Sequence, residues 1–139
     1  MDKVVIVMPA WNEAENIKKM ISTLIEEEFP KIDAEMNLLV VDNHSTDGTG
    51  EIVEEASKKY PNVHLIQQDK SGLGWAYVRG MQYAMDKLGA DAILEMDADF
   101  QHPPRLSSQW LKHIWLELIM RLVQGTLKAG RFPRSGRCQ

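Results

Sequence analysis

The sequence has a single cysteine, no long apolar run and no excess of basic charge, and each of these excludes a class of protein. Cys138 is the only cysteine in 139 residues, which rules out an intrachain disulfide and a thiolate metal cluster. The apolar stretch "VVIVMPA" is too short for a signal-peptide core, and no run approaches the roughly 20 residues of a membrane span. The formal net charge of -4 argues against nucleic acid as a partner. We therefore expect a cytoplasmic protein that meets a membrane only peripherally, at its cytoplasmic face.

The composition is that of one soluble globular domain, with 44% hydrophobic and 26% charged residues. Up to Pro104, short runs rich in branched side chains alternate with amphipathic helical patterns, which predicts an α/β fold with a mostly parallel sheet. The first two runs are apolar enough to be buried on both faces. The expected strands are residues 3–8, 37–41, 63–67 and 92–96, and the expected helices are residues 14–28, 49–60 and 73–88.

The helical patterns also predict where helices end and which residues share a face. Pro30 should end the first helix and Gly89 the third. Gly80 should let the third helix pack closely against its neighbour. The large apolar residues of the third helix recur at helical spacing and predict one shared face, made of Trp75, Val78, Met81, Met85 and Leu88.

Polar and acidic clusters follow three of the four expected strands. They are "PAWNEAEN" at 9–16, "DNHSTDGT" at 42–49 and "DADFQH" at 97–102. Because the carboxyl ends of parallel strands lie at one edge of a sheet, these clusters should meet there. Asp97 and Asp99 point the same way if their strand persists through Ala98. Two such carboxylates suit Mg²⁺ or Mn²⁺ bound together with a substrate phosphate.

Each cluster taken alone also has an ordinary structural interpretation. A lone D-x-D is more often a solvated turn or a helix cap than a metal site. Asn12 can be the N-cap of the first helix, and Ser45, Thr46 or Asp47 can cap the second. It is the occurrence of all three clusters at one predicted edge that favours a functional site.

The glycine-rich segment "SGLGWAYVRG" and the histidines indicate no further site. The segment follows the third strand and lacks a G-x-x-G completion, so a dinucleotide-binding fold is excluded. Gly72 and Gly74 are interpreted as allowing a tight turn or a close approach to a ligand. His44, His64 and His102 share no metal-ligand spacing and are interpreted as surface or hydrogen-bonding residues.

Four motifs in this order carry a family resemblance: "VVIVMPAWNEAENI", "LLVVDNHSTDGT", "GLGWAYVRG" and "LEMDADFQHPP". Together they resemble the nucleotide-sugar half of a family 2 glycosyltransferase of the GT-A fold, a Rossmann-like α/β/α sandwich. The form "MDADFQHPP" is similar to that of the polyprenyl (dolichyl) phosphate mannosyltransferase branch. The resemblance covers Val4 to Pro104, roughly three quarters of the chain, and so predicts a nucleotide-sugar-binding region at 1–104.

The resemblance implies one set of residues around a nucleotide sugar: Pro9, Trp11, Glu13, Asp42, Asp97, Ala98, Asp99 and Gln101. Asp42 would contact the base or ribose. Asp97 and Asp99, the catalytic residues of this interpretation, would hold Mg²⁺ or Mn²⁺ on the donor diphosphate together with Gln101. Trp11 replaces the usual tyrosine, and His44 follows Asn43 where an aspartate and a glycine are usual.

The implied reaction transfers mannose, with inversion, from GDP-mannose or another NDP-sugar to a polyprenyl phosphate at a membrane surface. A lipid monophosphate is largely dianionic at neutral pH, so its attack needs no dedicated general base. A nucleotide-sugar-binding module without transfer is the alternative. A nucleotidyltransferase is a third reading, but it would normally show a basic glycine-rich loop after the first strand, where "PAWNEAEN" is acidic.

Residues 105–139 form an atypical tail without the "GSRY"-like segment that supplies an arginine to the acceptor phosphate in this family. Read one frame over, residues 115–139 can encode "AGADYAIGSRYVKGGEIPKIGQVS". We therefore predict a frameshift near Pro104, and weak or no transferase activity for this chain. Stop codons in the shifted frame before that arginine would contradict the frameshift. The alternative is a genuine short variant whose tail forms an amphipathic helix.

Overall fold

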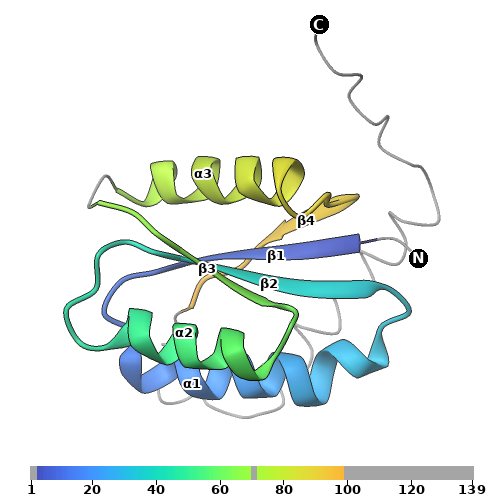
Figure 1. Ribbon diagram of the computed structural model, residues 1–139, viewed down its shortest axis with the longest axis horizontal. Helices are drawn as coiled ribbons and strands as arrows, with labels where there is room; N and C mark the ends of the chain where they lie inside the picture. Colours follow the sequence, from blue (N-terminus) through green and yellow to red (C-terminus); the bar gives the residue numbers. More distant parts are fainter. Residues whose placement is uncertain (1–2, 70–71, 99–139) are drawn as a thin grey trace, which may run out of the picture. The chain divides into compact units, whose positions relative to one another are not determined.

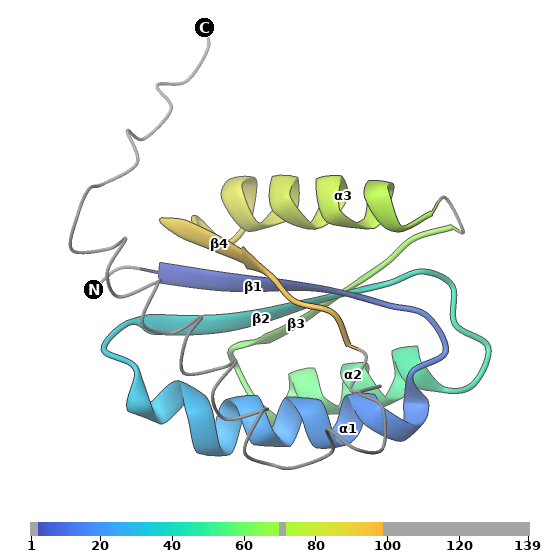
Figure 2. The ribbon, with the colours of Figure 1, turned by 180° about the vertical axis from the view of Figure 1, so that it is seen from behind.

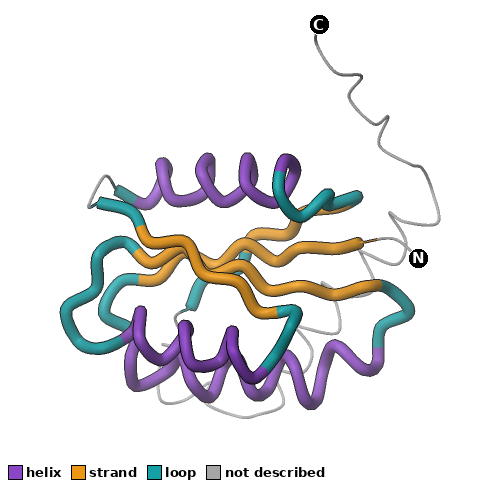
Figure 3. The backbone as a smooth tube through the Cα atoms, viewed as in Figure 1, coloured by secondary structure: helices purple, strands orange, loops and turns teal. Residues whose placement is uncertain are grey.

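Within residues 3–69 and 72–98, which the computed structural model describes, four parallel strands form one sheet in the order β3-β2-β1-β4. The strands are β1 (Lys3–Ala10), β2 (Glu35–Asp42), β3 (Val63–Gln67) and β4 (Ala92–Glu95). They form the middle layer between helices (Figure 3). The α/β class and the parallel sheet are thus confirmed. The predicted tail, 105–139, lies outside the described residues.

Three α-helices connect the strands in this part of the chain: α1 (Ala14–Ser22), α2 (Thr49–Lys59) and α3 (Leu73–Asp86). Past Ser22 the chain continues as a π-helical segment, Thr23–Glu28, and a 3-10 turn, Phe29–Lys31. The α- and π-helical run thus ends at Glu28, the predicted bound, two residues before Pro30. Pro30 lies at the start of the 3-10 turn, where its missing N–H group has no helical partner to lose.

The helices cover both faces of the sheet, α3 on one and α1 with α2 on the other (Figures 1 and 2). β1 is buried continuously from Val4 to Ala10, and β2 from Met36 to Asp42. Such uninterrupted burial is what a parallel strand covered by helices on both sides requires. The prediction that these two strands are buried on both faces is confirmed.

The face under α3 is packed with branched side chains from the strands and small residues from the helix. Its core consists of Val5, Val7, Leu39, Val41, Ile66, Ala76 and Ala84. A Cβ placed on Gly80 would lie 2.4 Å from Cγ1 of Val7 and 3.0 Å from Cγ2 of Val41. Only glycine permits so close an approach, which confirms the prediction for Gly80. α3 therefore rests directly on the two central strands.

Of the apolar residues predicted to share a face of α3, three are largely exposed, whereas Leu88 packs against the core. Trp75 is 64% exposed, Val78 45% and Met85 54%. The helix instead buries Ala76, Gly80 and Ala84, which recur every four residues on the opposite side. Large apolar residues dominate a pattern based on hydrophobicity, whereas here the small ones face the sheet because they allow close contact. Gly89 ends this segment as predicted, with a left-handed φ of 65°.

The order of the strands contains one reversal of direction. From β1 the chain moves through α1 to β2 and through α2 to β3, always toward the same edge. α3 then crosses the other face and places β4 against the free side of β1. The reversal lies between β1 and β4, and in open α/β sheets ligands bind outside the carboxyl ends of the strands at such a point.

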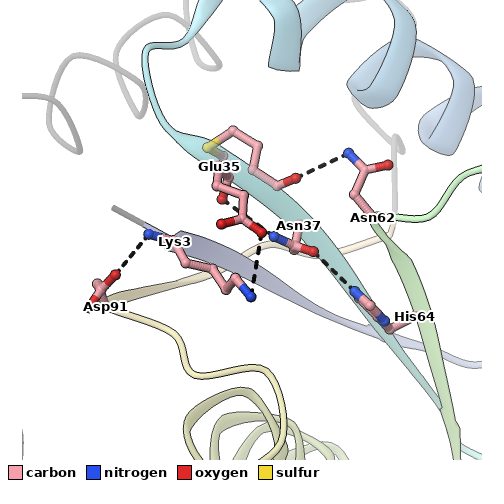
Figure 4. Close-up of polar contacts among 7 residues, drawn as sticks. Lys3, Glu35, Asn37, Asn62, His64 and Asp91 are labelled. Atoms are coloured by element: carbon pink, nitrogen blue, oxygen red, sulfur yellow. Dashed lines mark hydrogen bonds and ion pairs between the residues drawn. The ribbon is translucent and has the colours of Figure 1, made fainter. Parts of the chain in front are cut away.

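At the amino-terminal edge, a row of polar side chains joins neighbouring strands (Figure 4). Nζ of Lys3 lies 3.4 Å from a carboxylate oxygen of Glu35. Nε2 of His64 lies 3.0 Å from Oδ1 of the buried Asn37. The backbone N–H of Lys3 donates to the Asp91 carboxylate at 2.9 Å. Burial, followed by the charge of Lys3, lowers the pKa of His64, so this histidine is neutral in the folded protein at neutral pH.

Candidate functional site

The segments that follow β1, β2 and β4 emerge at the carboxyl edge of the sheet, as predicted. All described strands are parallel, so Trp11, Asn43 and Met96 leave the sheet at this same edge. β1 lies between β2 and β4. The residues after β1 therefore separate the segment after β2 from the one after β4.

The loop after β1 is hydrogen-bonded to the loop after β2. The N–H of Asn12 donates to Oγ of Ser45 at 2.9 Å, and the N–H of Thr46 donates to Oδ1 of Asn12 at 2.9 Å. Asn12 is therefore not the N-cap of α1, and that prediction is wrong: the cap position is Glu13. Asn12 has a left-handed φ of 51°, a region that asparagine tolerates better than most residues.

The start of α1 is capped by side chains from a distant part of the sequence. The N–H of Glu13 donates to Oγ1 of Thr49 at 2.9 Å, and the N–H of Ala14 donates to Oδ2 of Asp47 at 3.0 Å. Oδ1 of Asp47 also accepts the N–H of Thr49 at 3.1 Å. The hydrogen bond from the Thr49 hydroxyl, and then those from the backbone, lower the pKa of Asp47. Asp47 thus serves the first turns of two helices, where one was expected.

Asp42 is the last residue of β2 and is only 2% exposed. The hydroxyl of Ser45 donates to its Oδ1 at 2.5 Å. A Cβ on Gly50 would lie 3.0 Å from Oδ2 of Asp42 and 2.6 Å from Nε2 of Gln67, so the first turn of α2 packs tightly on this carboxylate. Ser45 also accepts from Asn12, and its single hydroxyl therefore connects the loop after β1 to Asp42.

A polar cavity of about 410 Å³ opens beside Asp42. Its described lining comes from the ends of β2 and β3 and from α2 and α3, and consists of Asp42, His44, Ser45, Glu51, Gln67, Gln68, Asp69 and Arg79. Of the predicted nucleotide-binding residues that lie within 3–69 and 72–98, only Asp42 is among the described lining residues of this cavity. Sequence reasoning missed the contribution of β3 because Gln67 to Asp69 form no cluster of charge that a motif search would notice.

Pro9, Trp11 and Glu13 lie after or within the end of β1 but are not among the described lining residues of that cavity. Pro9 is buried in the strand. Trp11 is 51% exposed, and the carboxylate of Glu13 accepts from Nδ2 of Asn16 at 3.3 Å. Their assignment to a nucleotide pocket stays a prediction.

His44, which was interpreted as a surface or hydrogen-bonding residue, lines the cavity and has a left-handed backbone with φ of 58°. This conformation favours glycine, the residue usual at this position in the family that the sequence resembles. The loop therefore keeps the conformation expected for that glycine although its side chain is an imidazole.

At the exit of β4, Asp97 is exposed and is held by α3. The hydroxyl of Tyr77 donates to Oδ1 of Asp97 at 2.7 Å. Burial, followed by this hydrogen bond, raises the pKa of Tyr77, which keeps the phenol protonated as a donor. Ala98 is buried, at 3% exposure.

The predicted common direction of Asp97 and Asp99 depended on a strand that continues through Ala98. β4 ends at Glu95, so the alternation of strand side chains does not extend to this pair. Asp99 and Gln101 lie outside the described residues. Whether the two carboxylates share a cation therefore stays a prediction.

The described residues fit a divalent ion that takes most of its ligands from elsewhere. No group of three or more histidine, cysteine or acidic side chains in residues 3–69 and 72–98 is placed to enclose a metal. Tyr77 occupies Oδ1 of Asp97, and an ionised carboxylate keeps acceptor capacity on its other oxygen. Mg²⁺ and Mn²⁺ are commonly bound through one or two carboxylates, with water and substrate phosphate completing the shell.

The sequence matches one protein family over most of its length. The model of the glycosyl transferase family 2 matches residues 5–115, which is most of the sequence. The chain belongs to glycosyl transferase family 2. The match contains the segments after β1, β2 and β4, so the edge described above lies within the matched part of the chain.

Relatives of this family 2 chain include named mannosyltransferases. It is 35% identical over 103 residues to the undecaprenyl-phosphate mannosyltransferase of Micrococcus luteus, covering 73% of this chain and 40% of the relative. It is 34% identical over 112 residues to the dolichol-phosphate mannosyltransferase of Pyrococcus furiosus, covering 81% of this chain and 30% of the relative. The chain thus spans well under half the length of these relatives.

Solved structures confirm the GT-A fold. The mannosyltransferase PcManGT from Pyrobaculum calidifontis, in complex with GDP-Man and Mn²⁺, is 27% identical with a TM-score of 0.56, covering 73% of this chain and 29% of that one. Mannosyl-3-phosphoglycerate synthase from Rubrobacter xylanophilus is 24% identical with a TM-score of 0.57, covering 75% of this chain and 33% of that one.

In the described part of the chain, no helix has the length and apolar character needed to cross a membrane.

Proposed function

We propose that this chain carries the donor side of a mannosyltransferase that transfers mannose from GDP-mannose to a polyprenyl phosphate, with inversion at the sugar. The observation that carries this proposal is the buried Asp42 beside a polar cavity at the carboxyl edge, in a chain 35% identical to an undecaprenyl-phosphate mannosyltransferase. Family membership supports glycosyl transfer, and the names of the relatives support mannose and a lipid phosphate.

The chemistry of the cavity favours a nucleoside over a bare phosphate. Its volume of about 410 Å³ is in the range of small-ligand sites. Asp42, Glu51 and Asp69 place carboxylates around it, and carboxylates accept hydrogen bonds from N–H and O–H groups. The guanine edge and the ribose hydroxyls supply such donors. Arg79 is a cation in the same lining, but three carboxylates outnumber it, so the cavity favours these donors over a diphosphate. We therefore assign the base and ribose to this cavity.

The diphosphate and the sugar are assigned to the exit of β4, which lies beyond β1 at the same edge. Asp97, Asp99 and Gln101 would hold Mg²⁺ or Mn²⁺ there, and the complex of PcManGT with GDP-Man and Mn²⁺ supports a divalent ion. When bound, such an ion neutralises charge on the departing nucleoside diphosphate. This chain's own contribution is to place Asp97 at the end of β4, next to the backbone of Ala98.

The acceptor is proposed to be the phosphate of a polyprenyl lipid, reached at a membrane surface. A phosphate monoester oxygen carries its negative charge at neutral pH, so it attacks the anomeric carbon without a dedicated base. Attack from the side opposite the departing diphosphate inverts the anomeric centre. The names of the two relatives, which specify undecaprenyl and dolichol phosphate, support this acceptor class.

Calorimetric titration of the 139-residue chain with GDP and UDP, with and without Mn²⁺, tests the donor side. We expect GDP to bind, Mn²⁺ to strengthen binding, and Asp42→Asn to weaken it about tenfold through the loss of a charged hydrogen bond. Asp33→Asn, a change of an exposed aspartate in the segment before β2, is the matched control. Equal GDP affinity in the Asp42 and Asp33 variants would contradict the assignment of the cavity.

Donor binding without transfer is the second candidate, because the cavity beside Asp42 is assigned only to the base and ribose of the donor. A radiolabelled transfer assay with GDP-mannose and polyprenyl phosphate separates the two. Binding with product formation supports the transferase, and binding without product supports the binding module. Absence of nucleotide binding would contradict both.

A further inference from the structure

Tyr77 reaches from α3 to the segment after β4, and its hydroxyl donates to Oδ1 of Asp97 at 2.7 Å. We propose that Tyr77 is a positioning residue that fixes the Asp97 carboxylate for a divalent cation. This inference rests on the proposed function, because it takes Asp97 as a ligand of that ion. According to this inference, the metal site depends on Tyr77 as well, a residue that lies outside the acidic motif.

Asp97 needs such a partner because the sheet no longer holds it. β4 ends at Glu95, and the N–H of Met96 still donates to the carbonyl of Val7 at 3.1 Å. Asp97 follows immediately and is exposed. An exposed aspartate one residue beyond the last hydrogen bond of the sheet samples several rotamers. Only some of these rotamers direct a carboxylate oxygen toward the cation. The hydrogen bond from Tyr77 selects among them.

Tyr77 can perform this role because its own position is fixed. The ring packs against the core cluster under α3, together with Ile93 of β4. Its neighbour Ala76 is fully buried, and Gly80, one turn further, lies directly on Val7 and Val41. A side chain anchored in this way loses little entropy when it makes its hydrogen bond. The hydroxyl is therefore a fixed point at the carboxyl edge.

The hydrogen bond also leaves the carboxylate able to bind a cation. Tyr77 donates to one oxygen, and the other oxygen keeps its lone pairs. Hydrogen bonds of this kind orient the ligands of protein metal sites, and their removal typically weakens metal binding by about 10- to 100-fold. For an exposed carboxylate we expect the lower end of that range, about tenfold.

Tyr77→Phe tests the proposal, and Tyr83→Phe is the matched control. Both changes remove a hydroxyl from α3, and both rings pack against the same core cluster. Free Mn²⁺ is measured by electron paramagnetic resonance in titrations of the 139-residue chain, alone and with saturating GDP. We expect Mn²⁺ affinity to fall about tenfold in Tyr77→Phe and to stay at the wild-type value in Tyr83→Phe.

The affinity for GDP without metal separates a structural role of Tyr77 from a positioning role. A loss of structure would lower this affinity, whereas a loss of positioning would leave it unchanged. It should be the same in wild type, Tyr77→Phe and Tyr83→Phe, because Asp42 and its cavity do not involve either hydroxyl. Equal Mn²⁺ affinities in the two variants would overturn the proposal. A parallel loss of metal-free GDP binding in Tyr77→Phe would also overturn it, since the residue would then be merely structural.

Asp97→Ala distinguishes a failure of this inference from a failure of the proposed function. If Asp97→Ala leaves Mn²⁺ affinity unchanged, the proposed metal site and the role of Tyr77 both fail. If Asp97→Ala weakens Mn²⁺ binding but Tyr77→Phe does not, only the role of Tyr77 fails. If both weaken it, the double variant should bind Mn²⁺ no more weakly than Asp97→Ala alone, because Tyr77 acts through Asp97.

Discussion

The loops after β1 and β2 are held in a different way from the segment after β4, although all three emerge at one edge of the sheet. Four side chains, Asn12, Ser45, Asp47 and Thr49, join the first two loops to each other by hydrogen bonds. After β4, Asp97 is exposed and is bonded by a residue of α3, Tyr77. The loops after β1 and β2 thus form a crosslinked part of the edge. The segment after β4 depends instead on α3, which lies on the face of the sheet opposite α1 and α2.

This difference separates two kinds of preorganisation. Asp42 lies in the crosslinked part, buried and bonded to Ser45, so a base that contacts it meets a rigid partner. Asp97 lies in the part held from a distance, where a single hydrogen bond from α3 orients an exposed carboxylate. Changes that act on only one part should therefore separate nucleotide affinity from metal affinity.

Gly80→Ala should have the largest effect and should disturb mainly the part held by α3. The new Cβ would lie 2.4 Å from Cγ1 of Val7, so the helix must shift away from the sheet. We expect a loss of about 1–3 kcal/mol in the free energy of unfolding, measured in urea. Mn²⁺ affinity should fall more than metal-free GDP affinity, because α3 carries Tyr77.

Gly74→Ala is the matched control on the same helix. A Cβ on Gly74 has no atom within 4 Å, and alanine favours helix by up to about 1 kcal/mol. Its free energy of unfolding should therefore rise or stay unchanged. A loss comparable to that of Gly80→Ala would contradict the close packing of α3.

Asp47→Ala should loosen the crosslinked part. It removes the acceptor of the Ala14 and Thr49 N–H groups, and loss of such a cap lowers stability by about 1 kcal/mol. Because the pKa of Asp47 is lowered in the folded state, its contribution is present above the ordinary value of 3.8 and is lost as the pH falls through the folded-state pKa. Urea midpoints of wild type and variant should converge in that acidic range. Asp33→Ala, an exposed aspartate, should show no such pattern.

His44→Gly should stabilise the crosslinked part slightly. His44 has a φ of 58°, where a side chain is strained and glycine is not. Part of that gain is offset by the greater freedom of glycine in the unfolded chain, so we expect a net gain of about 0.5 kcal/mol in thermal unfolding. His44→Ala keeps the Cβ and should show no gain. An equal gain in both variants would place the effect in the imidazole and not in the backbone.

The smallest expected effect lies at the amino edge, which should respond to pH without affecting either part of the site. The pKa of His64 is lowered by burial, so the unfolded state takes up the proton first. The stabilisation is present above about pH 6.5 and is lost as the pH falls below it. His64→Gln should flatten this dependence in urea unfolding. A change of GDP affinity in that variant at neutral pH would show that the two edges are coupled.

The fold could be predicted because β1 and β2 are uninterrupted branched apolar runs, and because polar clusters follow three strands. Their meeting at one edge follows from the parallel arrangement alone. The buried face of α3 could not be predicted in this way, since Ala76 and Ala84 contribute close contact and little hydrophobicity. The role of Asn12 depended on Ser45 and Thr46, more than 30 residues away, and local patterns contain no such pairing.

The candidate site was only partly predictable for the same reason. Asp42 was identified because it ends an apolar run, whereas Gln67, Gln68 and Arg79 reach the cavity through the strand order and the crossing of α3. Tyr77 was missed because it lies 20 residues before Asp97 and within an ordinary helical pattern. Chemistry at strand ends is visible in a sequence, but its partners from other elements are not.

In many nucleotide-binding α/β proteins the N-terminus of the first helix binds phosphate through its free amide groups and the positive end of the helix dipole. Here Asp47 and Thr49 already occupy the amides of Ala14 and Glu13, and Asp47 brings a negative charge of its own. The N-terminus of α1 is therefore a poor binding site for a pyrophosphate. We therefore expect a diphosphate to bind away from this terminus, beside a divalent cation that supplies counter-charge, so that nucleotide affinity depends on the concentration of that ion.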